Sequence, residues 1–253
     1  MSDIKIDARF IEELSFNAWP SLQTAYCDGW LLRFSQGYTQ RANSVSAIYQ
    51  SGENVDLLDR IHLCEQRYMH HSQRTVFKIS PAVQPDKETL DSLLAAEGYV
   101  QSGSTSVQIA DLTTFAVHQS ETILIEPVLS PYWLEAYCRL KPVDIAHIST
   151  LKQMLNNILL PHGFFGLDYD HQTIALGLAV VERGFVGIYN VVTNADFRNH
   201  GFGTQLMLNM LSWAKRHGAH HAYLQVVADN QPALHLYKKL GFQEFYRYWY
   251  RVK

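Results

Sequence analysis

The second half of the chain alternates between two apolar patterns, and that alternation restricts the folds it can adopt. Four segments carry apolar side chains every three or four residues, as amphipathic helices do: 131–140, 144–158, 202–217 and 231–240. Five others have the shorter apolar runs of strands: 164–169, 173–182, 185–193, 221–228 and 242–252. Arg183 and Gly184 suit a tight turn between the second and third runs. Strands interleaved with helices predict an α/β fold in which helices cover a sheet.

The first half has the same style with weaker definition. Its expected elements are helices at 7–16, 55–70 and 87–97 and strands at 30–34, 74–80 and 100–110. Trp30, Leu32 and Phe34 alternate with other residues, which predicts a half-buried strand. The pattern is weak from 111 to 121, and 253 residues can hold two modest cores. We therefore expect two domains, at 1–115 and 123–253.

The turn before the helix at 202–217 reads "RNHGFG" and starts at Arg198. A helix leaves its first N–H groups without intrahelical partners, so its N-terminus is suited to phosphate. Gly201 and Gly203 have no Cβ and would let an anion approach the backbone, while Arg198 adds charge and Thr204 a hydroxyl. An ordinary strand-to-helix turn is the alternative.

Two other phosphate motifs do not match this turn. The dinucleotide fingerprint needs a small residue where Leu206 stands, and the P-loop needs Gly-Lys-Ser/Thr, which the sequence lacks. The order Arg-x-x-Gly-x-Gly between a strand and a helix resembles the pyrophosphate loop of the GNAT (GCN5-related) N-acetyltransferase superfamily. A later segment, "VADNQPALHLYKKLGF", resembles that superfamily's second signature, with Asn230, Tyr237, Gly241 and Phe242 in order. The resemblance covers about 123–253.

The resemblance implies acetyl-CoA as the cosubstrate and no required metal. The cofactor would lie between two splayed parallel strands, at 185–193 and 221–227, with backbone groups near Val191 and Thr193 pairing to the pantetheine. Asn230 would touch the same arm, and Tyr237 would give a proton to the leaving thiolate. The pyrophosphate would be held by the loop residues Arg198, Asn199, His200, Gly201, Phe202, Gly203 and Thr204.

Three features depart from the family's pattern. Many relatives carry a glutamate as general base on the strand before the loop, but 185–193 has no acidic residue. Ala195 stands where a proline is usual, and only eleven residues follow Phe242, too few for the usual final hairpin. Water or another group would then remove the proton, and the sequence does not rank four candidates for it: Glu126, Asp168, His171 and Glu182.

A duplication would explain the short C-terminus. The segment at 90–110 runs parallel to 233–252 when Gly98 is set against Gly241, whereas no Arg-x-x-Gly-x-Gly occurs before residue 120. We expect two tandem GNAT-like halves, each a mixed central sheet flanked by helices. The first would be a degenerate half without a cofactor site, whose sheet either lends the missing edge strand or forms a wall of the substrate pocket.

Charge and composition exclude several partners. A formal net charge of −3 provides no broad basic surface for nucleic acid. No apolar run approaches the roughly 18 residues of a membrane span, the first ten residues lack the apolar core of a signal peptide, and three scattered cysteines fit a reducing compartment. We expect a cytoplasmic protein, monomer or homodimer, with neither membrane nor nucleic acid as partner.

Two functions remain open at this point. The first is an enzyme that moves an acetyl group from acetyl-CoA to a primary amine of a small molecule, an amino acid or a peptide. The second is a non-catalytic acyl-CoA-binding sensor that kept the cofactor loop. Tyr237 and Asn230 favour the enzyme, while the missing acidic residue on the strand at 185–193 favours the sensor.

Overall fold

A computed structural model describes residues 6–50, 56–84, 86–117 and 123–253. The chain forms two compact units: the first is Met1–Ser106 with Tyr246–Lys253, and the second is Val107–Phe245. The expected single boundary between 115 and 123 is therefore corrected. Two long strands, β5 (Val100–Asp111) and β11 (Gln243–Val252), each contribute residues to both units, so the chain passes between them twice. Residues 55 and 118–122, where a helix start and the boundary were expected, lie outside the described residues.

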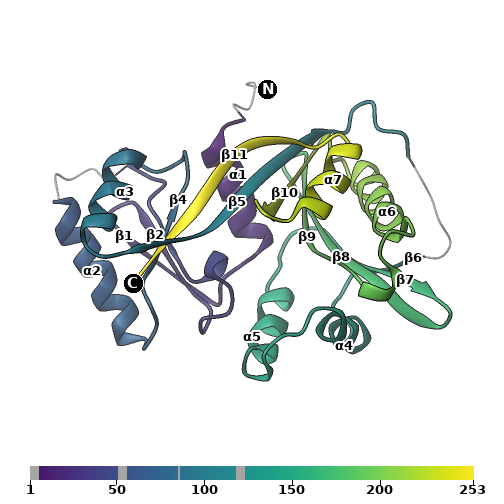
Figure 1. Ribbon diagram of the computed structural model, residues 1–253, viewed down its shortest axis with the longest axis horizontal. Coiled ribbons are helices and arrows are strands. Elements are labelled where there is room, and N and C mark those ends of the chain that lie inside the picture. Colours follow the sequence, from purple (N-terminus) through teal and green to yellow (C-terminus); the bar gives the residue numbers. More distant parts are fainter. Residues whose placement is uncertain (1–5, 51–55, 85, 118–122) are drawn as a thin grey trace. The chain divides into compact units, whose positions relative to one another are not determined.

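The first unit has strands in the order β1-β2-β3-β4-β11 and the α-helices α1, α2 and α3 (Figure 1). The β3–β4 pair is parallel, and the β1–β2, β2–β3 and β4–β11 pairs are antiparallel. Its remaining elements are α1 (Ala8–Ala18), β1 (Gln23–Cys27), β2 (Trp30–Phe34), η1 (Gln40–Ala42), β3 (Val45–Ser46), α2 (Leu57–His70), β4 (Val76–Ile79) and α3 (Lys87–Ala96).

Helices cover both faces of the first unit's sheet. Side chains of α2 and α3 pack on Phe77 and Ile79 of β4, whereas the intervening Lys78 pairs with Glu12 of α1. The prediction of a half-buried β2 is wrong, because all five of its residues are buried. Arg33 is tolerated there because its guanidinium donates to the carbonyl oxygens of Arg41, Phe16 and Trp19.

The second unit contains a mixed sheet in the order β5-β10-β9-β8-β7-β6. The β6–β7, β7–β8 and β8–β9 pairs are antiparallel, and β9 and β10 are parallel. The bounds are β6 (Ile123–Glu126), α4 (Pro131–Leu140), α5 (Ile145–Asn156), β7 (His162–Tyr169), β8 (Gln172–Glu182), β9 (Phe185–Thr193), η2 (Ala195–Phe197), α6 (Phe202–Arg216), β10 (His221–Val227) and α7 (Gln231–Lys239).

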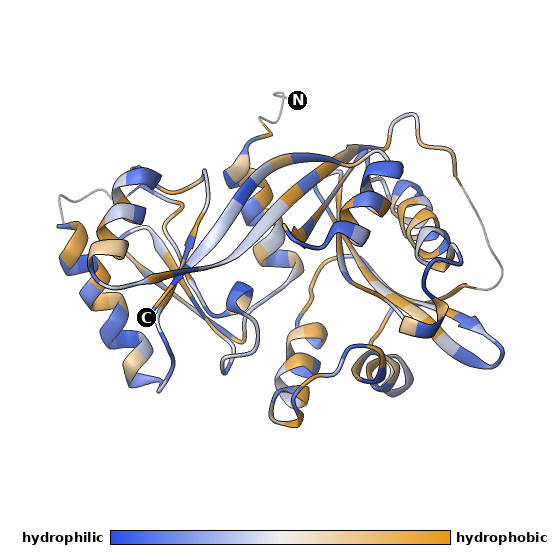
Figure 2. Cartoon of the chain, viewed as in Figure 1, coloured by the Kyte–Doolittle hydropathy of each residue, from blue (hydrophilic) through white to orange (hydrophobic). Residues whose placement is uncertain are grey.

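Two helix layers enclose this sheet, with α6 and α7 on one face and α4 and α5 on the other (Figure 1). The buried stripe of α6, which includes Leu206 and Met210, packs against β8 and β9. Figure 2 shows this stripe as hydrophobic residues that alternate with hydrophilic ones along the helix. The apolar runs predicted this packing, and Arg183 and Gly184 form the expected tight turn with φ of 48° and 78°.

Residues 107–111 of β5 belong to the second unit, where β5 is the neighbour of β10. By its sequence, the second half is one strand short of the expected fold. That strand is β5, which lies before the second half in the chain. In return, Trp249–Val252 of β11 pairs with Val76–Ile79 of β4 in the first unit. β6 was not predicted, because two of its four residues are exposed and its apolar run is short.

Each of the two long strands, β5 and β11, is preceded by a helix that ends just before a glycine. α3 ends before Gly98, which has φ of +85° and leads into β5, and α7 ends before Gly241, which has φ of +87° and leads into β11. The proposed duplication stays a prediction, although this shared helix–glycine–strand geometry agrees with it. No helix in the described ranges is long and apolar enough to span a bilayer.

Candidate functional site

Two parallel strands of the second unit pair only over their first halves. β9 and β10 form a ladder from His221↔Phe185 to Leu224↔Ile188. Beyond that last pair, β9 continues to Thr193 and β10 to Val227, but the two strands no longer pair with each other. The strands therefore open into a fork at their carboxyl ends. In open α/β sheets, ligands bind at the carboxyl ends of parallel strands.

The N-terminus of α6 follows β9 and has no side-chain cap. Each of the other six described α-helices begins with an aspartate, serine or asparagine whose side chain accepts a backbone N–H bond: Asp7, Asp56, Asp86, Ser130, Asp144 and Asn230. At α6 the cap residue is Gly201, and the first N–H groups are left for an external acceptor. This helix end combines those donors with the positive end of the helix dipole.

The two glycines of the turn have different physical roles. Gly201 has φ of +83°, and a Cβ there would have no neighbour within 4 Å, so it provides the left-handed turn beside open space. A Cβ on Gly203 would lie 3.3 Å from Thr193 Oγ1 and 3.5 Å from Leu236 Cδ2. Gly203 therefore lies where the end of β9, the start of α6 and α7 come together.

Arg198, Asn199 and His200 are exposed around this helix end. The Arg198 Nε donates to the Thr193 carbonyl oxygen over 3.4 Å, and His200 Nδ1 is 2.8 Å from the Arg198 carbonyl oxygen. Asn199 has φ of +64°. Thr204 is half-buried in the first turn of α6. A guanidinium and an imidazole thus flank the unpaired N–H groups, which suits a phosphate.

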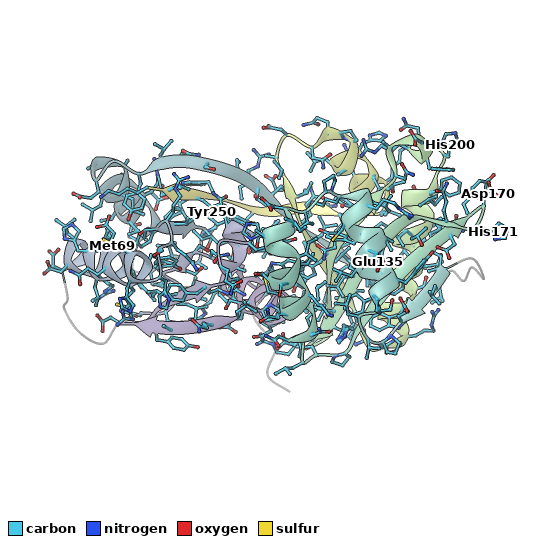
Figure 3. The ribbon with its side chains drawn as sticks, turned by 90° about the horizontal axis from the view of Figure 1, so that it is seen from below. Met69, Glu135, Asp170, His171, His200 and Tyr250 are labelled. Carbon is cyan, nitrogen blue, oxygen red and sulfur yellow. The ribbon has the colours of Figure 1, made fainter. Side chains whose placement is uncertain are left out.

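Phe202 joins this loop to the β7–β8 hairpin. Its ring centroid is 5.4 Å from that of Tyr169 and 6.1 Å from that of Phe197. Figure 3 shows the labelled His200, Asp170 and His171 at the same end of the second unit. The aromatic contacts fix the loop against the sheet.

Tyr237 and Asn230 both belong to α7. Tyr237 is buried against Phe242, and burial raises the pKa of its phenol to about 12. Its hydroxyl has no hydrogen-bond partner within the described part of the chain. Asn230 is exposed and caps the helix, because its Oδ1 accepts from the Ala233 N–H at 3.2 Å. Its Nδ2 remains able to donate elsewhere.

The two residues expected to make backbone contacts with the pantetheine lie on β9. Val191 packs against the core that α6 covers, and Thr193 pairs with Ala175 of β8 on one side. Both residues lie beyond Ile188, in the part of β9 that does not pair with β10. Thr193 lies next to Gly203 of the loop, since its Oγ1 would be 3.3 Å from a Cβ on Gly203.

The four candidate bases are scattered. Asp168 accepts from Thr173 Oγ1 at 2.6 Å, and His171 lies in the turn of the β7–β8 hairpin. Tyr169 of the same hairpin contacts Phe202 of the loop. Glu126 accepts from Ser130 at the outer strand β6. Glu182 is paired to Phe185 in the ladder, at the opposite end of β9 from the loop. The structure gathers no pair of them at the fork.

Side chains on the α4 face of the fork were missed by sequence reasoning. The Tyr137 hydroxyl donates to Asn190 Oδ1 at 3.2 Å, and the Tyr189 and Tyr223 hydroxyls are 3.0 Å apart. The sequence offered one signal, a single amide residue in the apolar run "FVGIYNVVT". The described residues contain no group of three His, Cys, Asp or Glu side chains placed to hold a metal ion.

Comparisons with known proteins cover almost the whole chain. Residues 5–251 match the family described as "Probable histone acetyltransferase Rv0428c C-terminal". An uncharacterized N-acetyltransferase of Bacillus subtilis (strain 168), YobR, is 29% identical over 252 residues, which are 98% of this chain and 99% of that protein.

Two solved structures share the fold. A GCN5-related N-acetyltransferase from Kribbella flavida aligns with a TM-score of 0.68 at 13% identity, over 97% of this chain and 95% of its own. A tandem GNAT protein from the clavulanic acid biosynthesis pathway aligns with a TM-score of 0.67 at 14% identity, over 96% and 87%.

Proposed function

Because the chain belongs to the family described as "Probable histone acetyltransferase Rv0428c C-terminal", and is a GNAT-type N-acetyltransferase, we propose that it transfers an acetyl group from acetyl-CoA to a primary amine. The acceptor would be a small molecule, an amino acid or a peptide. No metal takes part in this proposal.

The start of α6 is the observation that carries the proposal. It is the described α-helix without a side-chain cap, and it lies at the open end of the β9–β10 fork. The diphosphate of acetyl-CoA would accept hydrogen bonds from the first N–H groups of α6, with Arg198 and His200 beside it. The pantetheine would then enter the fork past Val191 and Thr193, with Asn230 at its other side.

Direct attack needs two proton movements. Acetyl-CoA supplies an activated acyl carbon: the amine nitrogen bonds to it, the carbon–sulfur bond breaks, and the sulfur leaves with the bonding electrons. The amine must lose one proton and the thiolate must gain one. Tyr237, on the α7 side of the fork, is the proposed donor to sulfur, and water is the proposed acceptor of the amine proton, because β9 carries no acidic side chain.

The raised pKa of Tyr237 bears on this role. A phenol pKa of about 12 keeps the hydroxyl protonated at every physiological pH, so the donor is always present. A thiol in water has a pKa near 8.5, so transfer from such a phenol is uphill until the thiolate is itself enclosed away from water. Tyr237 therefore acts late, as the carbon–sulfur bond breaks.

Release of free thiol tests the function directly. The chain is incubated with acetyl-CoA and a panel of amines that contains small amines, amino acids and short peptides, and CoA thiol is followed with a chromogenic disulfide. We expect amine-dependent thiol release with at least one acceptor class. Binding of acetyl-CoA by calorimetry without release for any amine would instead support the non-catalytic sensor.

A further inference from the structure

One residue of β9 has a backbone conformation that strands do not use. Asn190 has φ of +53°, in the left-handed region, although it lies within Phe185–Thr193. The ladder with β8 shifts at the same place, since Leu178 pairs with Tyr189 but Leu176 pairs with Val192. Asn190 is thus the extra residue of a β-bulge. Left-handed backbone in a non-glycine residue is strained, and such strain concentrates at functional sites.

The side-chain amide of Asn190 has a hydrogen-bond partner at its oxygen but, within the described residues, not at its nitrogen. Its Oδ1 accepts the Tyr137 hydroxyl at 3.2 Å, which fixes the direction of the amide. Its Nδ2 is shielded from solvent and has no hydrogen-bond partner within the described residues. A buried donor without a partner is unfavourable for folding, and native proteins satisfy nearly all such groups. A bound ligand can supply the missing acceptor.

The position of the bulge indicates which acceptor this is. Asn190 lies two residues beyond Ile188, the last residue of β9 that pairs with β10, and one residue before Val191. It is therefore at the closed end of the fork, where the proposed pantetheine path stops and the thioester would lie. The thioester's carbonyl oxygen is an acceptor, and it gains negative charge as the amine attacks.

We propose that Asn190 Nδ2 donates a hydrogen bond to the oxygen of the transferred acyl group, with Tyr137 as the residue that positions the amide. The proposal rests on acetyl-CoA being the donor substrate. It makes Asn190 a catalytic residue outside the loop and α7 motifs. The bond strengthens in the transition state, because the oxygen carries more charge there than in the thioester.

Binding without turnover provides the first test. Acetyl-CoA is compared by calorimetry with S-ethyl-CoA, which has the same shape but lacks the carbonyl oxygen. The wild-type chain should bind acetyl-CoA about fivefold more tightly, as one neutral hydrogen bond allows. In Asn190→Asp, which keeps the shape and loses the donor, this preference should fall to about one. Asn209→Asp is the control, since Asn209 is a buried asparagine whose Nδ2 already donates to Gln205.

Turnover provides the second readout. Asn190→Asp should lower kcat about 100-fold while KM for acetyl-CoA changes less than threefold. The ratio of wild-type to variant kcat should shrink as the pH falls, because the introduced carboxyl group regains an O–H donor when it is protonated. A purely structural role would give a ratio that does not depend on pH. Asn190→Gly, which suits the left-handed backbone, should show the same loss without the pH response.

The outcomes distinguish a failure of the proposed role of Asn190 from a failure of the proposed acetyltransferase function. If wild type turns over and Asn190→Asp retains both the wild-type kcat and the preference for acetyl-CoA over S-ethyl-CoA, the role of Asn190 is refuted and the acetyltransferase function stands. If wild type binds neither acetyl-CoA nor S-ethyl-CoA, both proposals fail. Should Asn190→Asp not fold, Asn190→Gly and Tyr137→Phe decide in its place, with a smaller kcat loss expected for Tyr137→Phe.

Discussion

At the scale of residues, the proposed site depends on two glycines, which have no side chain beyond Cα. Gly201 supplies a left-handed turn beside open space. Gly203 lets the start of α6 lie close to Thr193 and Leu236. The sequence predicted that both glycines let an anion approach the backbone, since a glycine turn before an amphipathic helix is a local signal. It did not predict that Gly203 packs against Thr193 and Leu236, because those contacts join segments far apart in the chain. It did not predict Asn190, because a bulge depends on the register with β8, which no local pattern records.

Gly201→Ala should weaken acetyl-CoA binding at least tenfold. The added methyl group enters the space where the diphosphate would lie, and the left-handed backbone adds about 1 kcal/mol of strain. Gly98→Ala is a matched control, because Gly98 has φ of +85° and equally open surroundings in the first unit. Thermal denaturation should show similar destabilisation of both variants, and calorimetry should show an affinity change in Gly201→Ala alone. Equal affinities would remove the loop from the binding site.

Tyr237→Phe should lower kcat by about 100-fold and leave the affinity for acetyl-CoA near that of wild type. The hydroxyl has no partner in the described protein, so its removal should not change the thermal midpoint by more than a degree or two. Steady-state kinetics with the best amine checks this, with the exposed Tyr26→Phe as control. Unchanged kcat would exclude Tyr237 as the proton donor.

At the scale of elements, the long strands are the feature that sequence patterns do not resolve. The run at 100–110 predicts a strand, but nothing in its apolar alternation tells which sheet each half joins. The helices were predictable almost to the residue, because Asp7, Ser130 and Asp144 provide local caps. β3, with two residues, falls below what a periodic pattern can detect.

β11 is held in the first unit by a charged contact with α3. Asp91 accepts from Arg251 Nε and Nη2, each at 2.8 Å, and from Trp249 Nε1 at 2.8 Å. The Arg251 guanidinium bound to Asp91 lowers the pKa of that carboxyl. Asp91→Asn should therefore destabilise the chain by about 2 kcal/mol at neutral pH, as measured by urea denaturation.

The sign of the pH dependence follows from the lowered pKa. The contribution of Asp91 is fully present above the unfolded pKa of about 3.9 and is lost as the pH falls through the lower folded value. The difference between wild type and Asp91→Asn should then shrink in acid. Glu88→Gln, in an exposed pair with Lys87, should change stability by less than about 0.5 kcal/mol at any pH. A constant difference down to pH 3 would contradict the assigned role of this pair.

At the scale of the whole molecule, the first unit depends on the C-terminal residues, because Tyr246–Lys253 belongs to it. Tyr246–Lys253 supplies the strand next to β4, and the Tyr246 hydroxyl donates to Glu12 at 2.9 Å. Glu12 and Lys78 are both buried, so loss of this segment would expose a charged pair with its neighbours removed.

Truncation after Phe245 should unfold the first unit while the core of the second persists. Limited proteolysis with mass spectrometry should then find early cleavage sites within residues 6–106 and protection across 123–245. Deletion of Lys253 alone is the control and should leave the digestion pattern of wild type. Uniform resistance of the truncated chain would show that β11 is dispensable for the first unit.

We propose that the uncapped start of α6 binds the diphosphate of acetyl-CoA. Calorimetric titration of acetyl-CoA into wild type and Gly203→Leu tests it most directly, because a side chain at Gly203 would lie against Thr193 and Leu236 at the mouth of the fork. We expect saturable binding to wild type and at least 100-fold weaker binding to a Gly203→Leu variant that remains folded by circular dichroism. Equal affinities for the two chains would contradict it.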